Sequence, residues 1–143
     1  EEAQDLELIN ELLSVMEKSN ADFTLVFRSL SDALLGNAEA IRKLFDNSSS
    51  FNIWLERWLQ RIELDTIDKE SIAKTMDQVN PIYIPRNHKV EEALRAAVLE
   101  ADMIPFSKLL EVLSNPYEEI KGKEGYASPA PITGLKYQTF CGT

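Results

Sequence analysis

The chain has one cysteine, Cys141, which stands third from the C-terminal end in the segment TFCGT. A thiolate on an exposed segment is a nucleophile that can form a disulfide with another cysteine. A thiol buried in a core is instead inert packing. The sequence leaves both readings of Cys141 open. One sulfur atom excludes an internal disulfide, so redox pairing would need a second cysteine from elsewhere.

The only histidine, His88, lies close to Arg86 in the segment NPIYIPRNH, residues 80–88. One imidazole without neighbouring Cys or His residues cannot complete a metal site, and the chain has no HExxH motif. We therefore predict that His88 is a connector or helix-cap residue. Arg86 could bind an anion at the start of the following helix, where backbone N–H groups point outward. A structural salt bridge to one of the many carboxylates is the favoured alternative.

Two tryptophans, Trp54 and Trp58, alternate with Arg57 and Arg61 in the segment WLERWLQRI. Aromatic rings beside arginines could form a stacking and phosphate-binding surface. The spacing of four residues between the tryptophans is also that of a helix whose aromatic face packs in a core. We favour the core reading.

The remaining candidates for chemistry are weak. The carboxylate pairs Glu91-Glu92 and Glu118-Glu119 are adjacent in sequence, so their side chains diverge on a helix and cannot act as an acid/base pair. The segment from Gly122 to Gly125 lacks the glycine spacing of a phosphate-binding loop. From the residues alone we predict no catalytic, cofactor-binding or metal-binding residue, and read alone this is not an enzyme sequence.

Apolar residues recur at helical spacing along most of the chain, with glycine or proline between the repeats. This pattern predicts an all-α fold, a compact bundle-like domain of about seven helices, and no strand. The expected helices are, by residue number, 6–18, 20–35, 38–45, 51–62, 65–79, 88–101 and 106–113.

Capping residues and apolar stripes make this prediction specific. Asn20, Asp65 and Asn87 are expected at helix starts, and Gly36 at a helix end. The last two helices should turn their apolar stripes inward. Those stripes are Val90, Leu94, Ala97, Val98 and Ala101 in one helix, and Phe106, Leu109, Leu110 and Leu113 in the other.

Helical periodicity stops after Asn115-Pro116, and the remaining residues are rich in glycine and proline. We expect residues 1–116 to be a helical domain and residues 117–143 an irregular tail carrying Cys141. The first residues, EEAQDLEL, lack an initiator methionine and begin inside a helical pattern. We therefore expect the chain to be a piece of a longer protein.

Composition restricts the partners. The 143 residues carry a net charge of −9, which disfavours nonspecific binding to nucleic acid or to an anionic membrane surface. No apolar run approaches the roughly 20 residues that span a bilayer. A single cysteine agrees with a reducing compartment. We therefore expect neither a nucleic-acid partner nor a membrane partner.

Several motifs resemble those of one known family. NPIYIPRNHKVEEAL at 80–94 and FSKLLEVLSNPYEE at 106–119 look like the C-terminal region of the selenoprotein O (YdiU-type) proteins. DFTLVFRSLS at 22–31 and WLERWLQRI at 54–62 match further. The ending TFCGT resembles the family's placement of a cysteine or selenocysteine just before the C-terminus.

The resemblance implies a function for the parent protein. Proteins of that family have a kinase-like (pseudokinase) fold and transfer AMP from ATP to hydroxyl side chains of other proteins, with a divalent ion such as Mg²⁺ neutralising the phosphates. No stretch here matches their nucleotide- or metal-binding residues. The resemblance therefore implies a C-terminal helical fragment, itself inactive, whose partners are the missing N-terminal kinase-like domain and the parent's protein substrates. Only Cys141 is carried over, as a possible redox residue.

Two further expectations follow. A bacterial source would place the protein in the cytoplasm, and a eukaryotic source in the mitochondrion. The alternative function is a stand-alone acidic helical module that binds other proteins without catalysis. The acidic charge, the broad apolar helix faces and the lack of catalytic motifs support that alternative.

Overall fold

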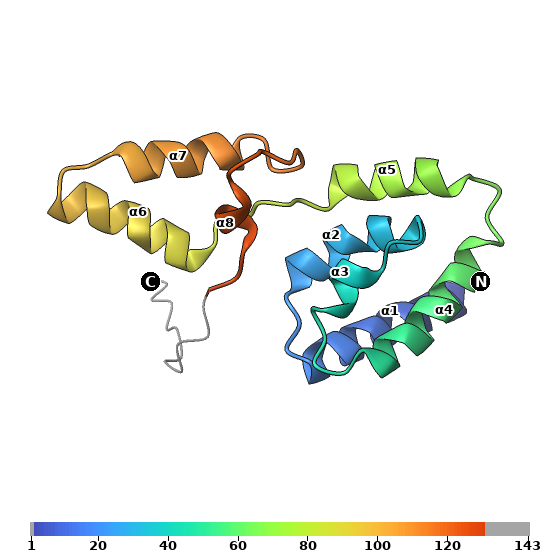
Figure 1. The fold of residues 1–143 in the computed structure, drawn as a ribbon. Helices are drawn as coiled ribbons and strands as arrows, with labels where there is room; N and C mark the ends of the chain where they lie inside the picture. The colour runs from blue at the N-terminus through green and yellow to red at the C-terminus, as the bar shows by residue number, and fades with distance from the viewer. Residues whose placement is uncertain (1, 131–143) are drawn as a thin grey trace. The chain divides into compact units, whose positions relative to one another are not determined.

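The computed structural model describes residues 2–130, and every regular element in that range is a helix. The all-α prediction is confirmed, with eight helices in the described range (Figure 1). Their bounds are α1 Glu2–Lys18, α2 Phe23–Leu34, α3 Glu39–Arg42, α4 Ser48–Ile62, α5 Lys69–Val79, α6 Asn87–Leu99, α7 Ile104–Leu113 and α8 Glu124–Ala127.

The chain divides into two compact units, Glu1–Pro81 and Ile82–Thr143. The first contains α1 to α5, and the second contains α6 to α8. The predicted division of the chain into a helical domain, residues 1–116, and an irregular tail, residues 117–143, stays a prediction. No helix in the described part of the chain is both long and apolar enough to cross a membrane.

The first unit is built around one apolar core, to which α1, α2, α3 and α4 all contribute. Helix α1 packs against α4, and α2 packs against α3 and α5. Four aromatic rings form a continuous stack through the core, with centroid distances of 4.5 Å, 5.8 Å and 5.6 Å. In order these rings belong to Phe45, Phe51, Trp54 and Trp58.

Three predicted helix starts in the first unit are corrected by the structure. Helix α2 is capped by Asp22 and not by Asn20, whose φ of +48° places it in a turn. Helix α5 is capped by Asp68, three residues after the predicted Asp65. In each case the carboxylate that caps accepts the backbone N–H three residues on. Helix α4 begins at Ser48, three residues before the predicted start at residue 51.

The predicted end of α2 at Gly36 is confirmed. The helix itself stops at Leu34, and Gly36 follows with a φ of +94°. An alanine there would be strained because the left-handed region places its Cβ too close to the backbone. A Cβ at Gly36 would meet nothing within 4 Å, so the backbone alone requires glycine.

In the second unit α6 and α7 lie side by side (Figure 1). Their buried residues are few and include Ala93, Leu109 and Val112. Most of the predicted inward stripes are wrong, because Leu94 and Val98 of α6 are exposed, as are Phe106 and Leu110 of α7. The predicted cap at Asn87 is also wrong: Asn87 is the first helical residue, and Arg86 is the N-cap without a capping side-chain bond.

Candidate functional site

The segment before α6 holds the chain that follows α7. The backbone N–H groups of Ile82 and Tyr83 both donate to the carbonyl oxygen of Pro116, at 2.7 Å and 3.2 Å. The Tyr83 side chain is buried, and its hydroxyl accepts the backbone N–H of Ile120 at 3.0 Å. Part of the NPIYIPRNH motif therefore anchors the residues after Pro116. The buried Tyr83 side chain therefore has a structural role.

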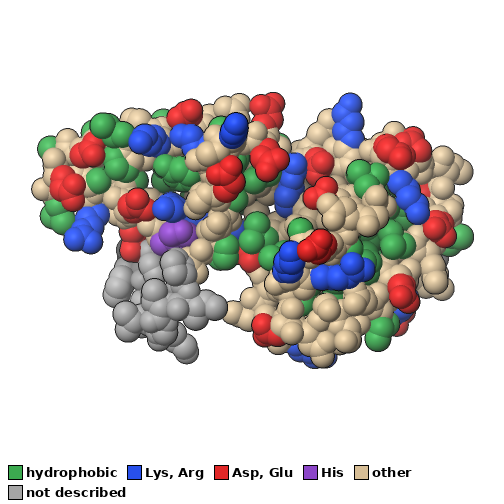
Figure 2. All heavy atoms as spheres, viewed as in Figure 1, with side chains coloured by type: hydrophobic (Ala, Val, Ile, Leu, Met, Phe, Trp, Pro, Cys, Tyr) green, Lys and Arg blue, Asp and Glu red, His purple; other side chains and the backbone are tan. Residues whose placement is uncertain are grey.

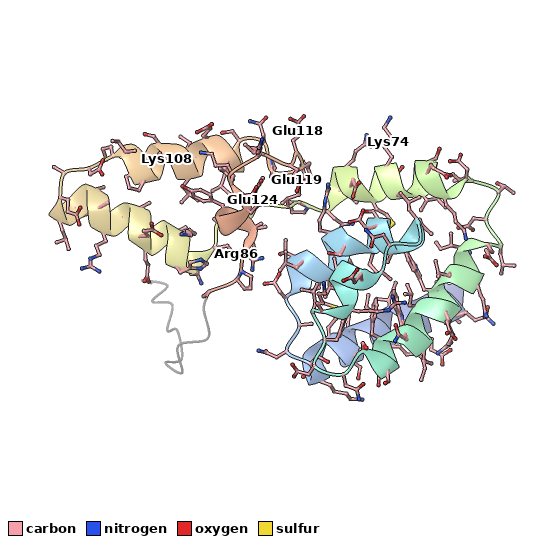
Figure 3. All side chains as sticks on the ribbon, viewed as in Figure 1. Lys74, Arg86, Lys108, Glu118, Glu119 and Glu124 are labelled. Atoms are coloured by element: carbon pink, nitrogen blue, oxygen red, sulfur yellow. The ribbon has the colours of Figure 1, made fainter. Side chains whose placement is uncertain are left out.

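Arg86 contributes to the same clasp. Its Nη2 donates to the carbonyl oxygen of Ala127, the last residue of α8, at 3.0 Å. Figure 3 shows Arg86 at the start of α6, beside the segment that contains α8. The guanidinium therefore contacts the backbone of α8, while the salt bridge and the anion site considered from the sequence both stay predictions. We call Tyr83 and Arg86, with their contacts to residues 116–127, the tail clasp.

His88 lies in the first turn of α6, so it is a helix residue and not a connector residue. Burial, with smaller contributions from the charges of Lys89 and Arg86, lowers the pKa of its imidazole. The neutral form of this side chain is therefore favoured relative to that of an exposed histidine. It borders an open depression of about 780 Å³ beside Glu91 and Arg95.

Metal binding finds no support in the donor set. Within residues 2–130, no three His, Cys, Asp or Glu side chains are grouped so that they could hold a metal ion.

Trp54 is a core residue, as favoured from the sequence. It is 4% exposed, and its indole N–H donates to the backbone carbonyl of Leu8 in α1 at 2.8 Å. The neighbouring arginines are paired with acidic residues of α1. Arg57 forms an ion pair with Glu11, and Arg61 binds both carboxylate oxygens of Asp5 at 2.7 Å and 3.2 Å.

Because Arg57 and Arg61 are engaged in these ion pairs, the structure does not support the alternative prediction that they form a phosphate-binding surface. Arg61 also bonds Asp65 at 2.9 Å, so two carboxylates already surround its guanidinium. The hydrogen bond to Asp5 is the main cause that raises the pKa of Arg61, and the same bond lowers the pKa of Asp5. A phosphate approaching this site would meet two negative charges.

A hollow of about 290 Å³ lies between α1, α2 and α4 in the first unit. Its walls are mostly apolar and include Ile9, Phe27 and Trp58. The Asp5–Arg61–Asp65 cluster is the only charged part of its lining. It therefore offers room for an apolar side chain and lacks the convergent polar groups of a substrate site.

Cys141 lies outside the described residues, so its role stays a prediction. Sequence reasoning missed the structural roles of Tyr83 and Arg86. A usable signal was present, because Pro81 and Pro116 interrupt the helical pattern on both sides of α6 and α7. Two interruptions of this kind can bring their flanking segments together.

The motif at 80–94 lies within a region that matches a known protein family. The family described as protein adenylyltransferase SelO matches residues 1–114. The chain belongs to the SelO family. This confirms the resemblance to the selenoprotein O (YdiU-type) proteins.

Individual members of the SelO family are also similar to the chain. A protein nucleotidyltransferase YdiU of Maridesulfovibrio salexigens is 46% identical over 96% of the chain, and one of Rhodopseudomonas palustris 44% identical over 98%. The YdiU of Bacillus mycoides is 43% identical over 99%. The chain spans only 28–29% of the length of these relatives.

Proposed function

We propose that this chain is a C-terminal helical part of a protein adenylyltransferase. The observation that carries the proposal is the 46% identity to a protein nucleotidyltransferase across 96% of the chain. The parent would transfer AMP from ATP to a hydroxyl group of a protein substrate. The hydroxyl oxygen attacks the α-phosphorus, the bond to the bridging oxygen of the β-phosphate breaks, and pyrophosphate leaves. The hydroxyl proton passes to solvent or to a base of the enzyme.

ATP and Mg²⁺ would be bound by the part of the parent that this chain does not span. Positioning of the nucleotide and stabilisation of the developing charge are the tasks of such a site. The sequence supports this division, since no stretch of it resembles the family's nucleotide- or metal-binding residues. The described helices would then have a structural role toward the kinase-like domain.

Cys141 would add redox regulation. Its thiol and a second cysteine thiol of the parent would form a disulfide, with two electrons and two protons passing to an oxidant such as a peroxide or a glutathione disulfide. The resemblance of the ending TFCGT to the family's C-terminal cysteine or selenocysteine supports this proposal. The disulfide would hold one arrangement of the parent's domains.

Transfer of radiolabelled or fluorescent AMP from ATP to protein tests the function. The full-length protein should label protein substrates or itself, and omission of divalent ions should abolish labelling. The 143-residue chain alone should give no labelling. No AMP transfer by the full-length protein, with magnesium or manganese present, would refute the proposal.

The redox role has its own test. Full-length wild-type protein and a Cys141→Ser variant are assayed for AMP transfer before and after treatment with a thiol reductant. We expect only the wild-type rate to change with reductant. Equal responses of the two proteins would eliminate Cys141 as the redox residue.

The size of the native gene product distinguishes the proposal from a stand-alone interaction module. An antibody raised against this chain should detect a band several times larger than its 16.2 kDa. A band at 16.2 kDa would favour the module, for which the exposed apolar residues of α6 and α7 are the supporting observation.

A further inference from the structure

Four large apolar residues are exposed where α6 ends and α7 begins. Val98 and Leu99 close α6 and are 78% and 70% exposed, and Met103 and Ile104 begin the next element at 54% and 59%. We call these four residues the tip patch. Figure 2 shows hydrophobic side chains among the charged ones in this unit.

The tip patch is a fixed surface and not a loose loop. The backbone N–H groups of Glu100 and Asp102 both donate to the carbonyl oxygen of Ala96, at 3.0 Å and 3.1 Å. The Asp102 carboxylate accepts the backbone N–H of Ile104 at 2.9 Å. Between them Ala101 is held at a φ of +53°, a conformation that alanine rarely adopts. The turn therefore keeps its apolar residues in one presented arrangement.

The apolar residues at helical spacing in α6 indicate that the surface around the tip patch is buried against a partner. Leu94 and Val98 form the kind of helical stripe that buries itself against a partner, yet both are exposed in this unit. Leu110 of α7 is likewise 56% exposed. Isolated exposed apolar residues are ordinary, but a group of them at one turn marks an interaction surface.

The charges at the turn restrict what covers it. Residues 98–107 contain Glu100 and Asp102 and no lysine or arginine. Anionic lipid headgroups would be repelled by this turn. A second copy brings the same acidic residues and a net charge of −9, which disfavours self-association. A complementary partner has an apolar site bordered by lysine or arginine.

We propose that the tip patch docks into the part of the full-length protein that this chain does not span, at an apolar site with a basic border. This inference rests on the proposed function, which makes the chain part of a longer protein. The length of the relatives supports this docking, because the chain spans only 28–29% of their residues and the remainder could supply the docking site. Docking within one polypeptide needs little intrinsic affinity, since the effective concentration is high.

Oxidation of Met103 to its sulfoxide tests the docking directly. The wild-type full-length protein is treated with dilute peroxide, and sulfoxide formation is followed by mass spectrometry at Met103 and at buried Met16. A synthetic peptide of residues 96–108 gives the unprotected rate. We expect Met103 in the full-length protein to oxidise at least about tenfold more slowly than in the peptide. Oxidation of Met103 at the peptide's rate, with Met16 still protected, overturns the proposal.

A matched pair of variants identifies the surface. Leu99→Glu places a charge in the tip patch, whereas Ile67→Glu replaces an apolar residue of similar exposure (60%) among polar neighbours. In the full-length protein Leu99→Glu should restore rapid oxidation of Met103, and Ile67→Glu should leave it protected. Because Leu99 is 70% exposed in its own unit, its replacement does not remove a core contact. Protection that survives Leu99→Glu overturns the proposal.

Two other occupants give different outcomes. If a second copy covers the patch, protection of Met103 falls on hundredfold dilution, which overturns docking within one polypeptide. If residues 131–143 cover the tip patch, Met103 loses its protection in a truncated form of the full-length protein that ends at Ala130. That result also overturns the proposal. The AMP-transfer assay on the same wild-type sample separates the two proposals. An active enzyme with unprotected Met103 refutes the docking alone, and an inactive one with protected Met103 refutes the function alone.

Discussion

The indole N–H of Trp54 in α4 donates to the backbone carbonyl of Leu8 in α1 at 2.8 Å. This bond joins α4 to α1 through two residues that are 46 apart in sequence. It also satisfies the one polar atom of the Trp54 ring, which is otherwise packed between Phe51 and Trp58. The same helix pair is joined at the surface by Arg57 and Arg61, which bond to carboxylates of α1.

Replacement of Trp54 should separate the hydrogen bond from the packing. Trp54→Phe keeps most of the ring and loses the bond to Leu8, and should lower the free energy of unfolding by about 1–2 kcal/mol. Trp54→Ala also leaves a cavity in the aromatic stack and should cost about 3–5 kcal/mol. Urea unfolding of the chain, followed by circular dichroism, measures both. Equal losses for the two variants would contradict this assignment.

A polar lock joins α2 and α5. The hydroxyl of Ser31, which is 5% exposed, donates to the Asp77 carboxylate at 2.6 Å, and Arg28 donates to the Asp77 carbonyl at 2.8 Å. Ser31→Ala should destabilise the first unit by about 1–2 kcal/mol because the bond is partly buried. Ser50→Ala, at an exposed position of α4, is the control and should change stability by less than about 0.5 kcal/mol.

Stability of the first unit should depend on pH through Asp5. The hydrogen bond from Arg61 lowers the pKa of the Asp5 carboxyl in the folded state. Its contribution is therefore complete above the ordinary aspartate pKa and is lost as the pH falls through the lower, folded-state value. The difference in urea midpoint between wild type and Asp5→Asn should shrink on acidification toward about pH 2. A difference that grows on acidification would show that ionisation of Asp5 does not stabilise the folded state.

Gly36 gives a test of backbone conformation without side-chain contacts. Gly36→Ala places an alanine at a φ of +94°, and should cost about 1–2 kcal/mol of stability. Gly125→Ala is the matched control, because a Cβ there also meets nothing within 4 Å and no left-handed conformation is required. Gly36→Asn should lose less than Gly36→Ala, since asparagine tolerates this region. Thermal unfolding of the three variants ranks them.

The tail clasp predicts a local effect of Tyr83. Tyr83→Phe removes the hydroxyl that accepts the Ile120 N–H, at a cost of about 1 kcal/mol, and so should raise the open population of this segment about fivefold. Limited trypsin digestion should then cleave faster after Lys121 and Lys123. Cleavage in the first unit should keep its wild-type rate. An unchanged rate after Lys121 and Lys123 would show that the hydroxyl does not hold the segment.

Helical periodicity predicts only part of the burial in either unit. In the first unit α1, α2 and α4 all contribute to one core, yet Leu6, Ile9 and Leu13 of α1 are exposed. In the second unit Leu94 and Val98 obey the same periodicity but are exposed, because two neighbouring helices cannot cover every apolar face. Periodicity reports which face is to be buried and does not identify the partner that buries it.

Helix starts show a second limit of prediction. Residue type alone favours Asn20 and Asp65 as caps, yet Asp22 and Asp68 cap α2 and α5. Asparagine and aspartate both favour the cap position, and only the local backbone decides which residue accepts an N–H bond. For the candidate site, the motif at 80–94 indicates the family, whereas the contacts of Tyr83 and Arg86 depend on how residues 116–127 fold back and are not apparent from the sequence. The role of Cys141 still depends on the resemblance.

The two bonds from Ile82 and Tyr83 to Pro116 have a consequence for how the SelO family could vary. They bring together the two ends of a stretch that contains both α6 and α7, so the chain enters and leaves this hairpin at one place. A segment with joined ends can be lengthened, shortened or exchanged while its surroundings keep their geometry. The α6–α7 hairpin is therefore a natural unit for grafting, and a transplanted hairpin could carry its docking preference from one relative to another.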